Sequence, residues 1–140
     1  MRAIVDRSDE LVIWAAQRIE WMHGRAFPDG ARAIGVEVAG EIGGAVVFHD
    51  WQPEYRTIQV SFAAADPRWM LARRAFGGMF DYAFNGCGVD KIWSLTPTTN
   101  ERALRAVIGL GFKPEAVLER QFGDVDAVMS RRFRWEYYAQ

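Results

Sequence analysis

The sequence is poor in the residues that build metal and disulfide sites. Its 140 residues include one cysteine, Cys87, and two histidines. A single thiol cannot form an internal disulfide, and so few ligands offer no pair at metal-binding spacing, so we expect no metal site and a reducing compartment. The G-x-S-x-G, Walker and dinucleotide-binding fingerprints are also missing, which argues against the common hydrolase and nucleotide-binding classes.

Long apolar runs and an excess of one charge are missing as well. No stretch approaches the roughly 20 apolar residues of a membrane span, and no apolar signal-peptide core is present near the N-terminus. Seventeen basic and 18 acidic residues give a net charge of -1, so no overall field draws the chain to nucleic acid. We expect one domain over residues 1–140, cytoplasmic, with neither a membrane nor a nucleic-acid partner.

Hydrophobic periodicity predicts the order of the elements. Helical spacing predicts helices between residues 6 and 24, over 66–85 and over 100–110. Alternation predicts strands at residues 2–5, 33–38, 42–48, 57–64, 92–96, 112–119 and 125–133, with 49–56 as a loop. The resulting order, β-α-β-β-β-α-β-α-β-β, predicts an α/β (α+β) domain with a mixed sheet and helices on its faces.

Two adjacent glycines, Gly77 and Gly78, interrupt the predicted helix at 66–85. Each costs on the order of 1 kcal/mol relative to alanine in a helix interior. We therefore expect the helix backbone to approach the sheet closely at these two residues.

Residues 92–112 carry the sharpest pattern: a buried strand, Asn100 as the cap of a short helix, and Gly111 as its end. With the motif Asn100-Glu101-Arg102-Ala103-Leu104 and Gly111-Phe112, the helix end Asp81-Tyr82-Ala83-Phe84 and the late turn Gly123-Asp124-Val125-Asp126, residues 33–132 resemble the GNAT superfamily of acetyl-CoA-dependent N-acetyltransferases. Within that superfamily the chain is most similar to the ribosomal-protein N-acetyltransferase branch.

The resemblance implies a mostly antiparallel sheet with one splayed parallel pair, the strands at 57–64 and 92–96. The pantetheine arm of the cosubstrate acetyl-CoA would enter this V-shaped opening, and the start of the helix after Asp66 would take the pyrophosphate. The acetyl group would pass to a primary amine, on a small molecule or a protein, by direct attack in a ternary complex. The aromatic tail at 134–140 hints at a homodimer. The implied cofactor-binding residues are Phe62, Ala63, Ala64, Arg68, Trp69, Arg73, Arg74, Asn100 and Arg102.

The chain departs from the family at three places. Residues 66–72 contain no glycine where the family has a glycine-rich phosphate loop, Gln59 stands where the branch often has a glutamate, and Ala103 replaces a serine. A general base must then come from elsewhere, and the candidates lie before the strand at 57–64. They are His49, Asp50 and Glu54. The alternative is a catalytically silent GNAT-like binding or regulatory module.

Each candidate also has a structural interpretation. Asn100 is a helix cap in either case, and His49 fits a structural or solvent-exposed histidine. The arginines at 68, 73 and 74 fit a solvated helix face.

Overall fold

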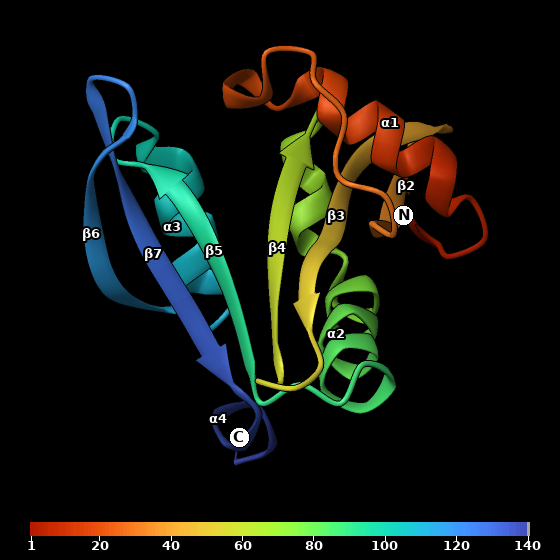
Figure 1. Cartoon of the computed structure of the whole chain (residues 1–140). Helices are drawn as coiled ribbons and strands as arrows, with labels where there is room; N and C mark the ends of the chain where they lie inside the picture. The colour runs from red at the N-terminus through yellow and green to blue at the C-terminus, as the bar shows by residue number, and fades with distance from the viewer. Residues whose placement is uncertain (140) are drawn as a thin grey trace.

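The computed structural model describes residues 1–139, which form a seven-stranded sheet (Figure 1). The strands are β1 (Arg2–Ile4), β2 (Arg32–Val38), β3 (Glu41–Gln52), β4 (Thr57–Ala64), β5 (Lys91–Pro97), β6 (Lys113–Phe122) and β7 (Val125–Phe133). Their order across the sheet is β1-β2-β3-β4-β5-β7-β6. Every neighbouring pair is antiparallel except β4 and β5. The predicted α/β fold with one parallel pair is confirmed.

Helices cover both faces of the sheet, with α1 (Ser8–Arg18) on one face and α2 (Arg73–Asp81) and α3 (Glu101–Gly109) on the other (Figure 1). Successive residues of β3 show this division, because side chains alternate along a strand. Val47 packs in the α1 core, whereas Val46 and Phe48 pack in the core under α2. No helix within residues 1–139 is both long and apolar enough to cross a membrane.

Two elements differ from the sequence prediction. Strand β3 continues to Gln52, so His49 lies in a strand and not in a loop. The predicted helix at 66–85 is three pieces: a 3-10 turn η2 (Pro67–Leu71), α2, and a π-helical turn η3 (Tyr82–Gly86). Ala72, at φ -80° and ψ 73°, interrupts the helical backbone between η2 and α2.

The glycine pair in α2 does not approach the sheet. A Cβ atom built at Gly77 or at Gly78 would meet no heavy atom within 4 Å. The predicted close packing is therefore wrong.

We expect Gly77→Ala and Gly78→Ala each to raise the free energy of unfolding by about 0.5–1 kcal/mol, because alanine loses less backbone entropy in a helix. Urea denaturation measures this, and a loss of stability would show that these positions need glycine.

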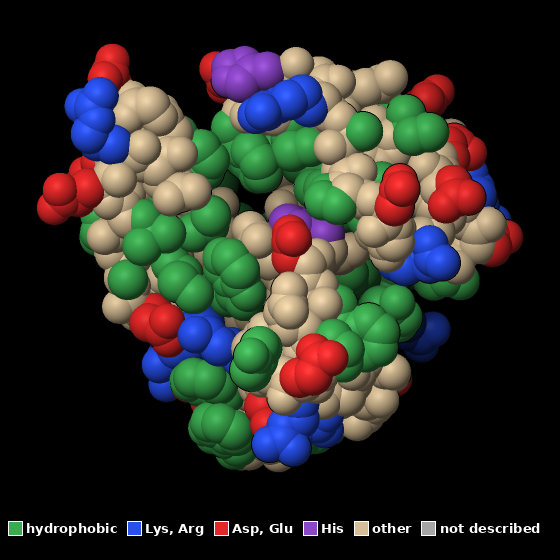
Figure 2. Space-filling view, viewed as in Figure 1, with side chains coloured by type: hydrophobic (Ala, Val, Ile, Leu, Met, Phe, Trp, Pro, Cys, Tyr) green, Lys and Arg blue, Asp and Glu red, His purple; other side chains and the backbone are tan. Residues whose placement is uncertain are grey.

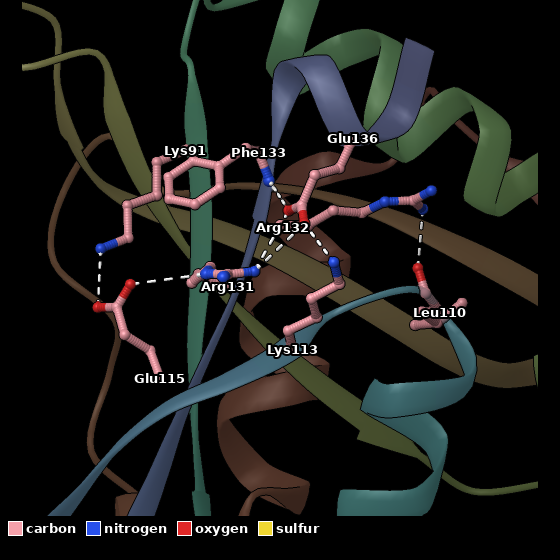
Figure 3. A network of polar contacts seen from close by, with 8 residues as sticks. All are labelled: Lys91, Leu110, Lys113, Glu115, Arg131, Arg132, Phe133 and Glu136. Atoms are coloured by element: carbon pink, nitrogen blue, oxygen red, sulfur yellow. Dashed lines mark hydrogen bonds and ion pairs between the residues drawn. The ribbon is translucent and has the colours of Figure 1, made fainter. Parts of the chain in front are cut away.

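The short C-terminal helix α4 (Arg134–Tyr138) is held to the sheet by an ion-pair network (Figure 3). Glu136 lies 2.9 Å from Lys113 Nζ and 3.3 Å from Arg131 Nη1, and it accepts a hydrogen bond from the Phe133 N–H. Arg131 also lies 3.6 Å from Glu115, which pairs with Lys91. Residues 134–138 of the aromatic tail thus form a docked helix.

Burial disfavours the charge on Glu136, but the Phe133 N–H and the contacts with Lys113 and Arg131 outweigh it and lower the pKa of this carboxyl from 4.5. A lowered pKa means stability that is present above pH 4.5 and lost as the pH falls through the folded-state value. We expect Glu136→Gln to cost about 1 kcal/mol at neutral pH and to reduce the acid loss of stability. Unchanged urea curves at pH 7 would contradict this.

Candidate functional site

Strands β4 and β5 pair only over their first residues. The register joins Thr57 to Lys91, Ile58 to Ile92 and Gln59 to Trp93. Beyond this point β4 stays paired with β3, and β5 with β7. The two strands therefore separate into a wedge, and the edges that face each other across it are open.

A cleft of about 800 Å³ lies in this wedge and forms the hollow between the two halves of the molecule in Figure 2. It passes from one face of the sheet to the other, because its lining includes residues next to α1 as well as the start of α3. The principal lining residues are Trp21 and His23 after α1, Val60, Ser61, Phe62 and Ala64 on β4, Pro67, Trp69 and Met70 on η2, Asn100, Arg102 and Ala103 at α3, and Phe122 and Val125 at the β6–β7 turn.

Trp69 forms a wall of the cleft. Its side chain is 3% exposed, and its ring centroid lies 5.2 Å from that of Phe76 and 6.5 Å from that of Phe62. The indole rests on Gly44 of β3, where an added Cβ would come within 2.1 Å of the ring. Gly44 is therefore the residue that lets Trp69 lie flat against the sheet.

A hydrogen-bonded chain of three side chains runs to the cleft from β3. His49 Nδ1 lies 2.5 Å from Asp50 Oδ2, and His49 Nε2 lies 2.8 Å from Ser61 Oγ. Because a carboxylate only accepts hydrogen bonds, Nδ1 carries the proton, and Nε2 then accepts from the Ser61 hydroxyl. Burial lowers the pKa of His49 below 6.5 and outweighs the opposite effect of Asp50. His49 is therefore neutral near pH 7, with its basic nitrogen on Ser61.

A β-bulge places the carboxylate in this chain. The β3–β4 register shifts between His49 and Gln52, and Asp50 has a positive φ of 54°. Bulges re-aim side chains, and aspartate tolerates the left-handed region better than most residues. Asp50 reaches the ring of its own neighbour in this way, while half of its side chain stays exposed.

Aromatic rings join the two halves of the molecule across the cleft. Trp21 follows α1 and Phe122 ends β6, and their ring centroids are 5.4 Å apart. Both residues line the cleft. They narrow its opening on the α1 side.

No protein-family model matches the sequence, and no curated protein matches it in sequence. Solved structures do share its architecture. Spermidine/spermine N-acetyltransferase SpeG from Vibrio cholerae, in complex with manganese ions, matches with a TM-score of 0.66 and 21% identity over 79% of this chain and 69% of that one. A dodecameric structure of spermidine N-acetyltransferase from Vibrio cholerae gives 0.65 and 21% over 78% and 68%. The chain has the GNAT fold.

Within the GNAT fold, the predicted cofactor-binding residues divide into two groups. Phe62, Ala64, Trp69, Asn100 and Arg102 line the cleft. Ala63 points the other way and packs in the α1 core. Arg68, Arg73 and Arg74 are solvent-exposed and lie outside the lining.

Asp66 holds Arg68 at the start of η2. Its Oδ2 lies 2.7 Å from Arg68 Nη2, and its Oδ1 accepts from the Arg68 N–H at 2.9 Å. The side-chain hydrogen bonds from Arg68 lower the pKa of Asp66. An anion that used Arg68 would therefore compete with this carboxylate.

Asn100 caps α3 and lines the cleft, so its two interpretations are compatible. Its Oδ1 accepts a hydrogen bond from the Ala103 N–H at 3.1 Å. Glu54, by contrast, lies in the exposed turn before β4, at the end where β4 and β5 are paired, and outside the lining.

Sequence reasoning missed Ser61, because its role depends on a register that the pattern does not contain. His49 stands opposite Gln59, and Ser61 is the diagonal neighbour two residues further along β4. Diagonal neighbours on one face of an antiparallel pair are within reach of long side chains. The one signal available was that the alternating pattern of the strand at 42–48 continues through His49. Pro53 obscured this signal, because a proline in the segment 49–56 favours a loop.

Proposed function

We propose that this chain is an N-acetyltransferase that moves the acetyl group of acetyl-CoA to a primary amine by direct attack in a ternary complex. The observation that best supports this proposal is the wedge between β4 and β5. It offers open strand edges for the amides of a pantetheine arm, and it passes through the sheet, so that thioester and amine can enter from opposite faces. Solved structures of the same fold that are named as N-acetyltransferases support this choice. The ribosomal-protein branch stays a prediction.

The residues around the wedge fit such a cosubstrate. Phe62, Ala63 and Ala64 form the open edge of β4 beyond its last pair with β5. Trp69 supplies an apolar wall, and Asn100 and Arg102 border the cleft where α3 begins. When bound, acetyl-CoA would supply an activated acyl group on a good leaving thiol.

Basic side chains stand near the start of η2, α2 and α3. Within residues 1–139, Arg73, Arg74 and Arg102 have no ion-pair partner, whereas Arg68 is held by Asp66. Unpaired guanidinium groups favour phosphate because they form charge-assisted hydrogen bonds. We assign phosphate contacts to Arg73 and Arg74, and to Arg68 where phosphate displaces the Asp66 carboxylate from it, in place of the missing glycine-rich loop.

The base in this proposal is His49, reached through Ser61. The ammonium of the acceptor gives a proton to Ser61 Oγ while the Ser61 proton passes to His49 Nε2, 2.8 Å away. Asp50 fixes the tautomer and stabilises the imidazolium that results. Glu54 stays the third candidate from the sequence, and its position in the β3–β4 turn makes it the weakest.

A thermal-shift titration with CoA and acetyl-CoA tests the proposal. A ligand at 100 times its dissociation constant adds about 2.7 kcal/mol to the free energy of unfolding. Release of CoA thiol against a panel of amines then tests turnover. No shift at millimolar ligand would overturn the proposal, and a shift without turnover would identify the silent binding module.

We expect Arg68→Ala combined with Arg73→Ala to weaken CoA binding by about tenfold or more, because charge-assisted hydrogen bonds contribute about 1.5–3 kcal/mol each. Isothermal titration at two salt concentrations measures the loss and its electrostatic origin. Arg105→Ala is the matched control, since Arg105 is an exposed arginine of α3 outside the cleft lining. Unchanged affinity in the double variant would remove the phosphate assignment.

The dodecameric Vibrio cholerae structure supports a homo-oligomer here too. Trp135 and Tyr138 of α4 are 60% and 50% exposed and form the contact surface that we propose. Sedimentation of the wild type and of Trp135→Ala would test it, and a wild-type monomer at high concentration would contradict it. The acceptor, an amine on a small molecule or a protein, stays a prediction, as does a cytoplasmic location.

A further inference from the structure

The contacts among Asp50, His49 and Ser61 are those of a nucleophilic triad. A carboxylate orients the imidazole through Nδ1 at 2.5 Å, and Nε2 accepts the serine proton at 2.8 Å. Such triads are recognised by geometry and roles, and they recur on unrelated folds in different chain orders. A proton relay needs only a hydroxyl that takes up one proton and gives up another. The arrangement here also makes the hydroxyl oxygen of Ser61 more nucleophilic.

Ser61 stands where an acyl group in the wedge would be within reach. It lies on β4 just beyond Gln59, the last residue that pairs with β5, and it lines the cleft. Its proton is directed at His49, so the lone pairs of Oγ are left for an electrophile. The open edge of β4 also carries backbone N–H groups of the kind that stabilise a developing oxyanion.

The structure around His49 is built to keep this chain in place. His49 is 6% exposed, and its ring centroid lies 5.1 Å from that of Phe27. The bulge at Asp50 uses a left-handed backbone conformation, which aspartate tolerates better than most residues, to aim a carboxylate at the ring. Asp50 is the titratable group in contact with His49 among residues 1–139.

We infer that Ser61 is a nucleophile that accepts the acetyl group of acetyl-CoA when no amine occupies the cleft, so that the chain has a second activity as an acyl-CoA hydrolase. This inference rests on the proposed binding of acetyl-CoA in the wedge. It differs from the direct transfer proposed above, in which Ser61 only relays a proton.

Each step of the reaction balances. Ser61 Oγ bonds to the thioester carbonyl carbon as its proton passes to His49 Nε2. His49 then gives that proton to the sulfur as the C–S bond breaks and CoA thiol leaves. Next, His49 takes a proton from water as the water oxygen attacks the ester on Ser61. His49 returns this proton to Ser61 Oγ as the ester C–O bond breaks, and acetic acid is released and ionises.

The test incubates the whole chain with acetyl-CoA and no amine. We expect a burst of CoA thiol followed by slow steady release, and peptide mapping by mass spectrometry after an acid quench should place one acetyl group on Ser61. We expect Ser61→Ala to lose the adduct and to slow thiol release by about 10²-fold or more. A CoA thermal shift equal to that of the wild type shows that this variant is folded.

Ser94→Ala is the matched control. Ser94 is a buried serine on β5, outside the cleft lining, so its loss should leave both adduct and hydrolysis unchanged. Acetyl-CoA binding without an adduct on Ser61, or undiminished hydrolysis by Ser61→Ala, overturns the inference and leaves the proposed transferase standing. Absence of acetyl-CoA binding overturns both.

Discussion

Replacing His49 with glutamine is expected to slow acetyl transfer by roughly 10²–10⁴-fold, the usual contribution of a positioned general base. Glutamine is close to histidine in size and keeps a hydrogen-bonding group near Ser61, but it cannot take up a proton. The loss should therefore fall on kcat at saturating acetyl-CoA, with little change in cosubstrate affinity. Steady-state assays at pH 7.5 together with isothermal titration would separate the two quantities.

The pH dependence of the wild type adds a second readout of His49. Burial lowers the pKa of His49 from 6.5, although the hydrogen bond and charge of Asp50 act in the opposite direction. Activity needs the neutral ring, so the acidic limb of the kcat/KM profile should have its midpoint below pH 6.5. In the unfolded chain the ring has its ordinary pKa of 6.5 and binds a proton at a higher pH than in the folded chain. The free energy of unfolding should therefore also fall as the pH drops from 6.5 through the lower pKa of the folded state. His49→Gln should remove both effects.

Two companion variants make the assignment specific. Asp50→Asn should also reduce kcat, because an amide no longer enforces the productive tautomer of the ring. Glu54→Gln should change the rate less than about twofold, since Glu54 lies in the exposed turn at the closed end of the wedge. Equal rates for the wild type and for the His49, Asp50 and Glu54 variants would exclude a proton relay from this part of the chain.

The parts of the fold that the sequence predicted well are those with local causes. The strands at 57–64 and 125–133 match β4 and β7, because an alternating pattern over eight or nine residues is a local signal for a strand. Asn100 caps α3 as predicted, since a side-chain cap acts within one turn of its helix. The parallel pairing of β4 with β5 followed from the family resemblance and from no local pattern.

The parts that the sequence did not predict depend on distant residues. The break at Ala72 ends the turn η2 that holds the buried Trp69. The burial of Trp69 depends on the absence of a side chain at Gly44, which lies on β3. His49 was assigned to a loop because Pro53 follows it, whereas a bulge lets β3 continue past it. A bulge changes which residues face each other, so the pairing of His49 with Ser61 was hidden from any period-two pattern.

Trp69→Ala is expected to lower the free energy of unfolding by about 3–5 kcal/mol, the range for removing a large buried aromatic side chain. Trp69 is 3% exposed and joins Phe62, Phe76 and the backbone at Gly44, so its removal leaves a hole between η2 and the sheet. The same change removes one wall of the cleft, and CoA affinity should fall with it. Urea denaturation and titration measure the two losses, and a cost below about 1 kcal/mol would show that the indole is not a core residue.

A double-mutant cycle with Gly44 isolates the contact itself. A Cβ at Gly44 would lie 2.1 Å from the Trp69 ring, so Gly44→Ala should cost about 1–3 kcal/mol in the wild type through overpacking. In the Trp69→Ala background the new methyl group has free space, and the cost should nearly vanish, which leaves a coupling energy of the same size. Gly77→Ala is the control for alanine in place of glycine, because nothing lies within 4 Å of its Cβ position and its effect should add to that of Trp69→Ala. Additive losses for Gly44 and Trp69 would mean that the indole does not rest on this strand, and that the wall of the cleft is built in some other way.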